Sequence, residues 1–474
     1  MLTLVAALAA GVALTGCRTM APPYVQPAAP VASTFPGGGD PAATATAADV
    51  PWQEFLQDAQ LRAIVAQALE SNRDLRSAVI GIERARALYR IQRAALLPTV
   101  NGAVSGTRQR IPEGLFGGIG GGAFNAEQYS ASVGVSGYEL DVFGRIRSLN
   151  EQALQQFLAT EQARRAVQIA LVAEVAQAWL TYAADTDRLR LAHETLDNQQ
   201  AALTLTRQRL EAGITSALAV RQAETTVESA RVDAARYLSQ MAQDRNAIEL
   251  LVGAPVGDAQ LPATPAQALA VLADLPAGTP SDLLQRRPDI LAAEHDLRAA
   301  YANIGAARAR FFPTISLTGS LATASRSLSS LFTAGTGAWS FAPQLVAPLF
   351  TAGRNRATLR VAEADQQLAV ASYERAIQVA FREVADALAQ RSTIDAQVSA
   401  QQALVDAAAD GYRLADARFR GGVDNFLTVL DAQRSLYAAQ QGLISIRFAR
   451  TATLVSLYRA LGGGWSGSPA ASAP

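Results

Sequence analysis

Short segments of alternating polar and apolar residues occur in two places along the chain. Residues 314–321 alternate without exception, and residues 338–345 do the same with larger apolar side chains. Residues 130–136 alternate in the same way, and residues 99–107 do so more weakly. Because neighbouring side chains on a strand point to opposite faces, each pair predicts a hairpin with one apolar and one polar face. Both a half-buried soluble sheet and a membrane barrel with a wet lumen fit this pattern.

Long segments with apolar residues at helical spacing follow the two hairpins. Residues 145–212 and 354–420 contain no Pro and are rich in Ala, Leu, Val and Gln, so each predicts one uninterrupted helix. At about 1.5 Å per residue, each would extend about 100 Å. Apolar-periodic segments 216–252 and 425–461 predict helices that return after a Gly-containing turn. A coiled-coil stalk would show the same helical pattern, but it would not need a strand hairpin before each helix.

The order of hairpin, long helix and return helix occurs twice, so the chain is an internal repeat. Gly144 corresponds to Gly353 and Gly213 to Gly422, at the same separation along the chain. The predicted first repeat is residues 52–252, which begins with a helix and has its hairpin at about 98–140. The predicted second repeat is residues 281–461, which also begins with a helix and has its hairpin at about 313–347. The Pro-rich residues 253–280 are predicted to form an equatorial connection between the two repeats.

Four strands in one chain leave two open sheet edges, and neither a bilayer nor a sheet flanked by long helices tolerates such edges. Other subunits must therefore cover them. Two copies would supply eight strands, which form a barrel filled by its own side chains, whereas three copies would supply twelve strands and an open lumen. If the function is transport, the strand count predicts a homotrimer.

The N-terminal residues predict export. Residues 1–16 form an apolar signal peptide that ends in Leu14-Thr15-Gly16 before Cys17. This resembles a lipoprotein signal, in which Cys17 becomes the first mature residue and is acylated; an ordinary secretory signal is the alternative. Arg18 at the next position suggests delivery to the outer membrane. Residues 17–51 predict a lipid-anchored tether rich in Pro and Ala, and residues 462–474 a disordered tail.

Composition and charge exclude several other functions. The chain has 50% hydrophobic but only 6% aromatic residues, which favours closely packed helices with small side chains. Lys plus Arg equals Asp plus Glu, at 41 each, so no general positive charge favours nucleic acid. No run of eighteen apolar residues follows Cys17, so we expect no transmembrane helix and any membrane crossing must use strands.

Motifs for catalysis or metal binding are missing from the sequence. His193 and His295 occur singly on predicted helices, where we expect them to face solvent rather than a metal. The Gly-rich residues 117–122 lack the Lys and following helix of a phosphate-binding loop. The sequence therefore predicts no enzyme, no cofactor and no metal.

Five segments carry a resemblance to a known family. They are residues 72–76 (Asn-Arg-Asp-Leu-Arg), 138–145 (Tyr-Glu-Leu-Asp-Val-Phe-Gly-Arg), 284–290, 347–354 (Ala-Pro-Leu-Phe-Thr-Ala-Gly-Arg) and 419–433. Together, and in this order, they resemble the outer membrane efflux proteins of the TolC superfamily, in the NodT-type lipoprotein branch.

The resemblance implies a mainly α fold with membrane β-structure. Each protomer of a trimer would give four strands to a 12-stranded β-barrel and long helices to a periplasmic α-barrel, anchored in the outer membrane by lipid. The implied partners are a periplasmic adaptor and an inner-membrane pump of the resistance-nodulation-division class, with no nucleic acid. The implied function is an exit duct for small molecules such as drugs or toxic compounds, gated by an iris-like opening of the periplasmic helix tips.

The same resemblance places candidate site residues at the two helix tips. Relatives carry gate residues beside the second tip, where Phe419, Asp424 and Asp431 stand in this sequence. Three carboxylates around a threefold axis would repel one another and bind cations. An N-cap role for Asp424 and a solvated position for Asp431 are the alternatives. Candidate adaptor contacts at the tips are Arg209, Gly213, Arg418, Gly421 and Gly422, and for the glycines a left-handed turn requirement is the alternative.

Other functions remain open from the sequence. A related duct for type I secretion or metal export would look similar. A non-conducting periplasmic structural lipoprotein would share the helices, and a surface-anchored enzyme is disfavoured by the missing motifs.

Overall fold

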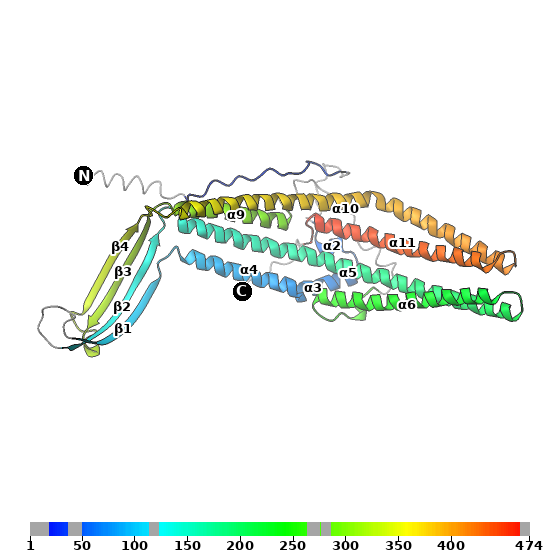
Figure 1. Ribbon diagram of the computed structural model, residues 1–474, viewed down its shortest axis with the longest axis horizontal. Helices are drawn as coiled ribbons and strands as arrows, with labels where there is room; N and C mark the ends of the chain where they lie inside the picture. Colours follow the sequence, from blue (N-terminus) through cyan, green and yellow to red (C-terminus); the bar gives the residue numbers. More distant parts are fainter. Residues whose placement is uncertain (1–18, 37–49, 113–122, 263–274, 276–285, 465–474) are drawn as a thin grey trace. The chain divides into compact units, whose positions relative to one another are not determined.

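The computed structural model describes residues 19–36, 50–112, 123–262, 275 and 286–464. The chain, whose helices and strands are labelled in Figure 1, divides into two compact units. The first comprises Met1–Pro27, Glu83–Ala159 and Ala293–Tyr373; the second comprises Ala28–Ile82, Thr160–Ala292 and Glu374–Pro474. Each unit therefore contains parts of both sequence repeats, and the long helices pass from one unit into the other.

The first repeat contains α2 (Trp52–Phe55), α3 (Ala59–Ser71), α4 (Arg73–Ala94), β1 (Val100–Ile111) and β2 (Phe124–Leu140). It ends with α5 (Arg145–Glu211) and α6 (Ala217–Val252). A short helix, η2 (Asp258–Gln260), follows. The second repeat contains α9 (Pro288–Ala309), β3 (Thr314–Ser325), η3 (Leu328–Ser330), β4 (Gly337–Val346), α10 (Arg354–Arg420) and α11 (Phe426–Ala460). The long helices α5 and α10 each have 67 residues.

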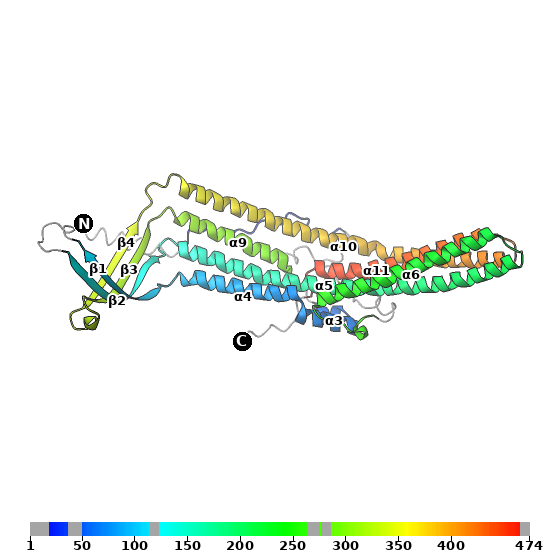
Figure 2. The same cartoon turned by 60° about the horizontal axis from the view of Figure 1, so that its bottom comes forward.

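The four strands form one antiparallel sheet in the first unit, in the order β1-β2-β3-β4 that Figure 1 shows, and Figure 2 shows the same strands in a turned view. Its faces differ as the alternation predicts. One face carries exposed apolar side chains, among them Val104, Leu321 and Trp339. The other carries small hydroxyl residues, and two of them pair across strands: Ser105 with Ser130, with 2.7 Å between their Oγ atoms. Since β1 and β4 lie at the ends of the order, their outer edges have no partner strand among the residues that the structure describes.

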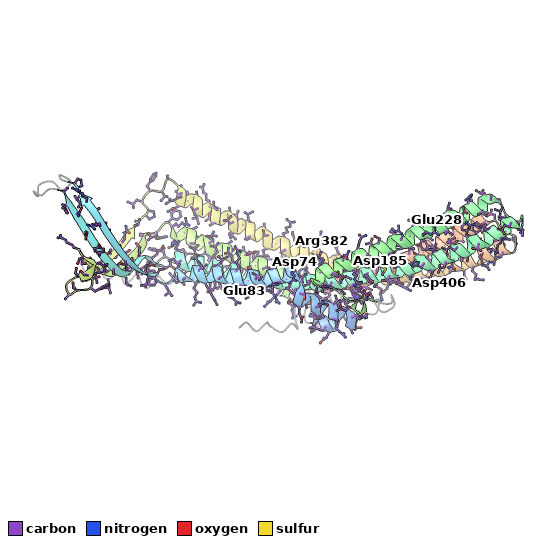
Figure 3. The ribbon with its side chains drawn as sticks, turned by 90° about the horizontal axis from the view of Figure 1, so that it is seen from below. Asp74, Glu83, Asp185, Glu228, Arg382 and Asp406 are labelled. Atoms are coloured by element: carbon purple, nitrogen blue, oxygen red, sulfur yellow. The ribbon has the colours of Figure 1, made fainter. Side chains whose placement is uncertain are left out.

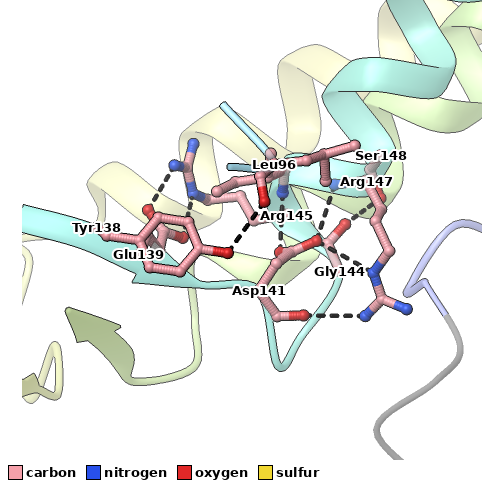
Figure 4. Close-up of polar contacts among 9 residues, drawn as sticks. Leu96, Tyr138, Glu139, Asp141, Gly144, Arg145, Arg147 and Ser148 are labelled. Carbon is pink, nitrogen blue, oxygen red and sulfur yellow. Dashed lines mark hydrogen bonds and ion pairs between the residues drawn. The ribbon is translucent and has the colours of Figure 1, made fainter. Parts of the chain in front are cut away.

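The junction between β2 and α5 is held by carboxylates (Figure 4). Asp141 accepts hydrogen bonds from the backbone N–H groups of Ile146 (2.9 Å) and Arg147 (2.8 Å), two of the donors that a helix N-terminus leaves unsatisfied. Glu139 accepts two further bonds from the Arg145 guanidinium, at 2.8 and 2.6 Å. These bonds stabilise the first turn of α5 and fix its direction from the strand.

The core of the second unit is mainly aliphatic, and it includes a buried aromatic stack and a buried arginine. Phe55 stacks on Tyr458 with 3.9 Å between ring centroids. Arg287 is buried, and its guanidinium donates to Asp289 (2.9 Å), Glu383 (2.8 Å) and the Ala460 carbonyl (2.9 Å). Because each nitrogen of this buried guanidinium donates a hydrogen bond, Arg287 connects α9, α10 and α11 at modest desolvation cost.

One described helix, α5, contains a stretch long and apolar enough to cross a membrane by length and composition. Fifty-six per cent of that stretch is buried within the protein, as in the core helix of a soluble region. We therefore interpret it as a packed helix.

The two histidines differ in their surroundings. His193 is exposed on α5, as expected. His295 is half-buried on α9 instead, and its Nδ1 lies 2.7 Å from Gln155 Oε1, so the expectation that it faces solvent is wrong. Among the described residues no group of three or more His, Cys, Asp or Glu is arranged to hold a metal.

Candidate functional site: the two helix tips

The turn between α5 and α6, here called the first tip, closes by a defined helix-ending motif. The Ile214 N–H donates to the Arg209 carbonyl (2.8 Å), and the Gly213 N–H donates to the Leu210 carbonyl (2.9 Å). This is the Schellman pattern, which requires a left-handed residue at its penultimate position. Gly213 has that conformation, with φ of 70°. Ser216 then caps α6 by accepting from the Ala219 N–H.

The turn between α10 and α11, the second tip, repeats this geometry. The Val423 N–H donates to the Arg418 carbonyl (2.9 Å), and the Gly422 N–H donates to the Phe419 carbonyl (3.0 Å). Gly422 has φ of 76°, whereas Gly421 is absent from the positive-φ residues of the described chain. A Cβ on Gly421 would lie 3.4 Å from its nearest neighbour, the Ala417 oxygen, which is ordinary contact. The turn therefore requires Gly422, while Gly421 has no such conformational requirement.

Phe419 lies inside the second tip rather than on its surface. Its side chain is only 8% exposed and packs on Phe426, with 5.3 Å between ring centroids. Arg209 comes from the first tip and places its guanidinium carbon 4.4 Å from the centre of the Phe419 ring. It also donates to the Phe419 carbonyl at 3.4 Å. Arg209 and Phe419 thus connect the two tips by a cation–π contact and a long hydrogen bond.

The hydrophobic core beneath the tips is shared by all four helices. Its buried members are Leu203, Ala219, Val220, Ala223, Val227, Ala415, Phe419, Phe426, Val429 and Leu430. Burial of this set packs α5 and α6 against α10 and α11 close to their turns.

Arg418 and Asp424 form an ion pair within the second tip. The Arg418 guanidinium donates to both carboxylate oxygens of Asp424, at 2.6 and 3.0 Å. This bidentate contact lowers the pKa of Asp424 below its ordinary value and keeps the carboxylate charged. The N-cap alternative for Asp424 is wrong, because Asn425 performs that role and accepts from the Thr428 N–H at 3.2 Å.

Asp431 has much weaker contacts. Its carboxylate lies 4.0 Å from the Arg434 guanidinium, and both side chains are about two-thirds exposed. Such a pair contributes little to stability. In the single chain, Asp431 therefore has the solvated position that the sequence left open.

The structure brings most of the predicted tip residues together. Arg209 contacts Phe419, and Arg418 contacts Asp424, while Asp431 lies further along α11. Sequence reasoning missed Phe426 and the capping role of Asn425. An Asn directly before an apolar-periodic run is an N-cap signal that could have identified Asn425. Cys17 lies outside the described residues.

Comparison with known proteins agrees with this architecture. The family model "Outer membrane efflux protein" matches residues 64–254 and 279–463. The toluene efflux pump outer membrane protein TtgC of Pseudomonas putida is 48% identical over 460 residues, covering 95% of this chain and 93% of that protein. A solved membrane protein from Pseudomonas aeruginosa superposes with a TM-score of 0.88 at 47% identity, covering 96% of this chain and 99% of the other. The open MtrE outer membrane channel of Neisseria gonorrhoeae superposes with a TM-score of 0.84 at 39% identity, covering 94% and 99%.

A four-stranded antiparallel sheet joined to 67-residue helices is the fold of TolC-like outer-membrane channels, as the resemblance implied. The chain belongs to the outer membrane efflux protein family. Its location is the outer membrane, and it functions as the outer-membrane channel of an efflux system. The predictions of fold class, function and compartment are confirmed.

Proposed function

We propose that the chain acts as a homotrimer in which three sheets close into a 12-stranded barrel. The observation that carries this proposal is the sheet order, which leaves β1 and β4 with unpaired edges and one apolar face. Unpaired backbone groups are costly in lipid, so each β1 edge would pair with the β4 edge of a neighbour. Twelve strands enclose a lumen lined by the small hydroxyl face of the sheet.

In this function the trimer passively conducts small molecules delivered by a periplasmic adaptor and an inner-membrane pump of the resistance-nodulation-division class. The named toluene efflux relative supports small toxic compounds as cargo. No step of catalysis is assigned to the chain, so energy for transport comes from the pump. Acylated Cys17 adds a lipid anchor to the barrel.

Cysteine cross-linking and conductance test this proposal together. One cysteine on β1 and one on β4, scanned along the two edges, should give covalent trimers under oxidising conditions. The same trimers should form conducting pores in planar bilayers. Cross-linked dimers, or trimers without conductance, would instead support the non-conducting structural lipoprotein.

We further propose that the second tip is the gate, with the Arg418–Asp424 pair holding its turn closed. Three copies of Asp424 would surround the threefold axis, and Asp431 would provide a second ring further along α11. Removal of the carboxylate should release the turn and remove a cation site, so Asp424→Ala should raise trimer conductance at neutral pH. Asp410→Ala removes an exposed carboxylate away from the turn and should leave conductance unchanged.

The pH dependence of the gate follows from the lowered pKa of Asp424. The ion pair contributes above the ordinary carboxyl pKa and is lost as the pH falls through the lowered value. Wild-type conductance should therefore rise on acidification toward the Asp424→Ala level. A wild type and an Asp424→Ala variant with equal conductance at neutral pH would remove the gate assignment.

The tips are also the proposed adaptor-contact surface. Gly213, Gly421 and Gly422 lie at the turns, and the guanidinium of Arg209 is already engaged by Phe419. Around Gly213 and Gly422 a new Cβ would meet no atom within 4 Å, so the surface at each turn is open to a partner.

A further inference from the structure

The apolar face of the sheet changes character along β1. Side chains at even positions of β1 lie on the same face as Val133 and Leu321, because the register places Gly102 opposite Val133 and Val133 opposite Leu321. Val100 and Val104 are exposed on this face. The next even positions toward the outer end are Gly106, Arg108 and Arg110. Two arginines thus follow directly after the apolar part of a lipid-facing surface.

The length of the strand sets the depth of these arginines. From Val100 to Arg110 the strand rises about 34 Å at about 3.4 Å per residue. With the usual tilt of about 40°, this is about 26 Å along the membrane normal, close to the height of the apolar band of outer-membrane barrels. A cation in the middle of that band would be unfavourable by about 2–4 kcal/mol, but near its boundary the cost is small. The position of Arg108 and Arg110 is therefore the level of the lipid headgroups.

An aromatic side chain marks the same boundary. Tyr129 pairs with Gly106 in the register, and a Cβ on Gly106 would lie 3.1 Å from the Tyr129 ring. Gly106 thus provides the space in which this ring lies on the lipid-facing side. Tyr at this depth is typical of the aromatic girdle between hydrocarbon and headgroups.

The two arginines differ in their partners. Arg108 is 71% exposed and pairs with Glu127 at 2.9 Å. Arg110 is exposed and lies opposite the neutral Asn125, with no ion pair among the residues that the structure describes. A neighbouring copy whose β4 pairs along the β1 edge could not neutralise Arg110 from β3, β4 or the segment between them, since residues 314–346 contain neither Asp nor Glu.

We infer that Arg108 and Arg110 form a headgroup clamp that binds the phosphates of an anionic, phosphorylated glycolipid in the outer leaflet. Guanidinium groups bind phosphate oxygens bidentately, and the contact is charge-assisted on both sides. Two arginines spaced by two residues on one strand face lie about 7 Å apart along the strand, so they can engage two phosphates of one headgroup. This inference rests on the proposed orientation, with the helices in the periplasm and the hairpin loops outside.

The test uses the full-length trimer in phosphatidylcholine vesicles that contain either diphosphoryl lipid A or dephosphorylated lipid A. The readout is the amount of lipid A that remains bound to the purified trimer, measured by mass spectrometry. Wild type should retain diphosphoryl lipid A preferentially. Arg110→Gln should lower this retention about tenfold, as expected for loss of a charge-assisted contact. Arg110→Lys should retain an intermediate amount, because it keeps the charge but loses the bidentate geometry.

Two variants with opposite expectations sharpen the test. Glu127→Gln removes the carboxylate that competes for Arg108 and should raise retention above wild type. Arg413→Gln removes an exposed cation from α10 and should leave retention unchanged. Equal retention of both lipids by wild type, or unchanged retention in Arg110→Gln, would overturn the clamp. A loss of trimer stability in Arg110→Gln that is independent of lipid would assign Arg110 to the contact between copies instead.

Conductance separates this inference from the proposed function. Arg110→Gln trimers should still conduct as wild type does, since the clamp lies on the outer face. If wild-type trimers fail to conduct, the channel proposal fails while the lipid measurement stays interpretable.

Discussion

The helix pairs α5–α6 and α10–α11 have the same backbone plan and different interiors. In each pair a 67-residue helix ends in a Schellman turn, and the two turns use equivalent glycines. In the first pair, Asp185 and Asp244 are buried, at 3% and 8% exposed (Figure 3 labels Asp185 on α5). The equivalent positions of the second pair hold Ile394, also buried, and Thr453, whose hydroxyl is hydrogen-bonded to Gln390. One copy of the repeat therefore buries two ionisable groups where the other buries none.

These two carboxyl groups are unequally satisfied. Asp185 pairs with Arg188, which also donates to Ser445 of α11 at 3.1 Å. Asp244 Oδ2 has no hydrogen-bond partner in the described structure. Burial, and secondarily the neighbouring Asp185 carboxylate, raise the pKa of Asp244 to about 6. The stability of the first pair therefore depends on pH near neutrality. The second pair has no titrating group at the equivalent position.

At the tips it is the second pair that contains the charged carboxylate, and not the first. At the second tip, Phe419 is buried and Asp424 forms an ion pair, whereas the equivalent residues of the first tip are Leu210, which is 37% exposed, and Thr215. The first helix pair thus contains the buried carboxyl groups, whereas the second contains the turn with the ion pair and the buried aromatic ring. Equal backbones do not imply equal roles.

The largest expected effect comes from the aromatic residue. Phe419→Ala should lower the free energy of unfolding by about 3 kcal/mol, because it leaves a cavity in the core shared by four helices. Leu210→Ala, at the equivalent position, should cost less than about 1 kcal/mol because that side chain is already partly exposed. Denaturant unfolding followed by circular dichroism measures both. Similar losses in the two variants would show that the tips do not differ in packing.

The next effect is the pH dependence of the first pair. Folding raises the pKa of Asp244, so its contribution is fully present below pH about 4 and is lost as the pH rises through about 6. Asp244→Asn should therefore stabilise the protein at neutral pH by about 2 kcal/mol and have little effect at pH 4. Thermal unfolding across this range tests it, with Asp410→Asn, an exposed carboxylate, as control. A constant difference at all pH values would contradict a titrating Asp244.

A smaller effect separates the two adjacent glycines of the second tip. Gly422→Ala forces a Cβ into the left-handed region and should cost about 1–2 kcal/mol. Gly421→Ala needs no such conformation and should be nearly neutral or slightly stabilising. Hydrogen exchange at the Val423 N–H, which closes the turn, is the local readout. Equal protection in the two variants would show that the turn tolerates a side chain at either position.

Much of the fold could be predicted from local pattern. Alternation located the hairpins, and the absence of Pro together with the repeated glycines located the long helices and their turns. Contacts between residues far apart in sequence could not be predicted in the same way. Arg209 reaches the Phe419 ring 210 positions away, and Asp244 meets Asp185 after a helical hairpin has closed. The repeat also does not predict the two compact units, since each unit is built from segments of both repeats.

The smallest expected effect is that of Thr215→Asp. This variant tests whether the carboxylate alone makes the second tip different from the first. Thr215→Asp gives the first tip the carboxylate of the second, at the equivalent position beside Arg209. The identical turn geometry predicts an ion pair between the new carboxylate and Arg209, which would draw the guanidinium away from the Phe419 ring. Because Arg209 then leaves the second tip, Thr215→Asp and Arg209→Ala should loosen the contact between the tips equally, and the double variant should add nothing. Hydrogen exchange of the Phe426 region measures that contact, and additive losses would show that Arg209 keeps its position whatever side chain replaces Thr215.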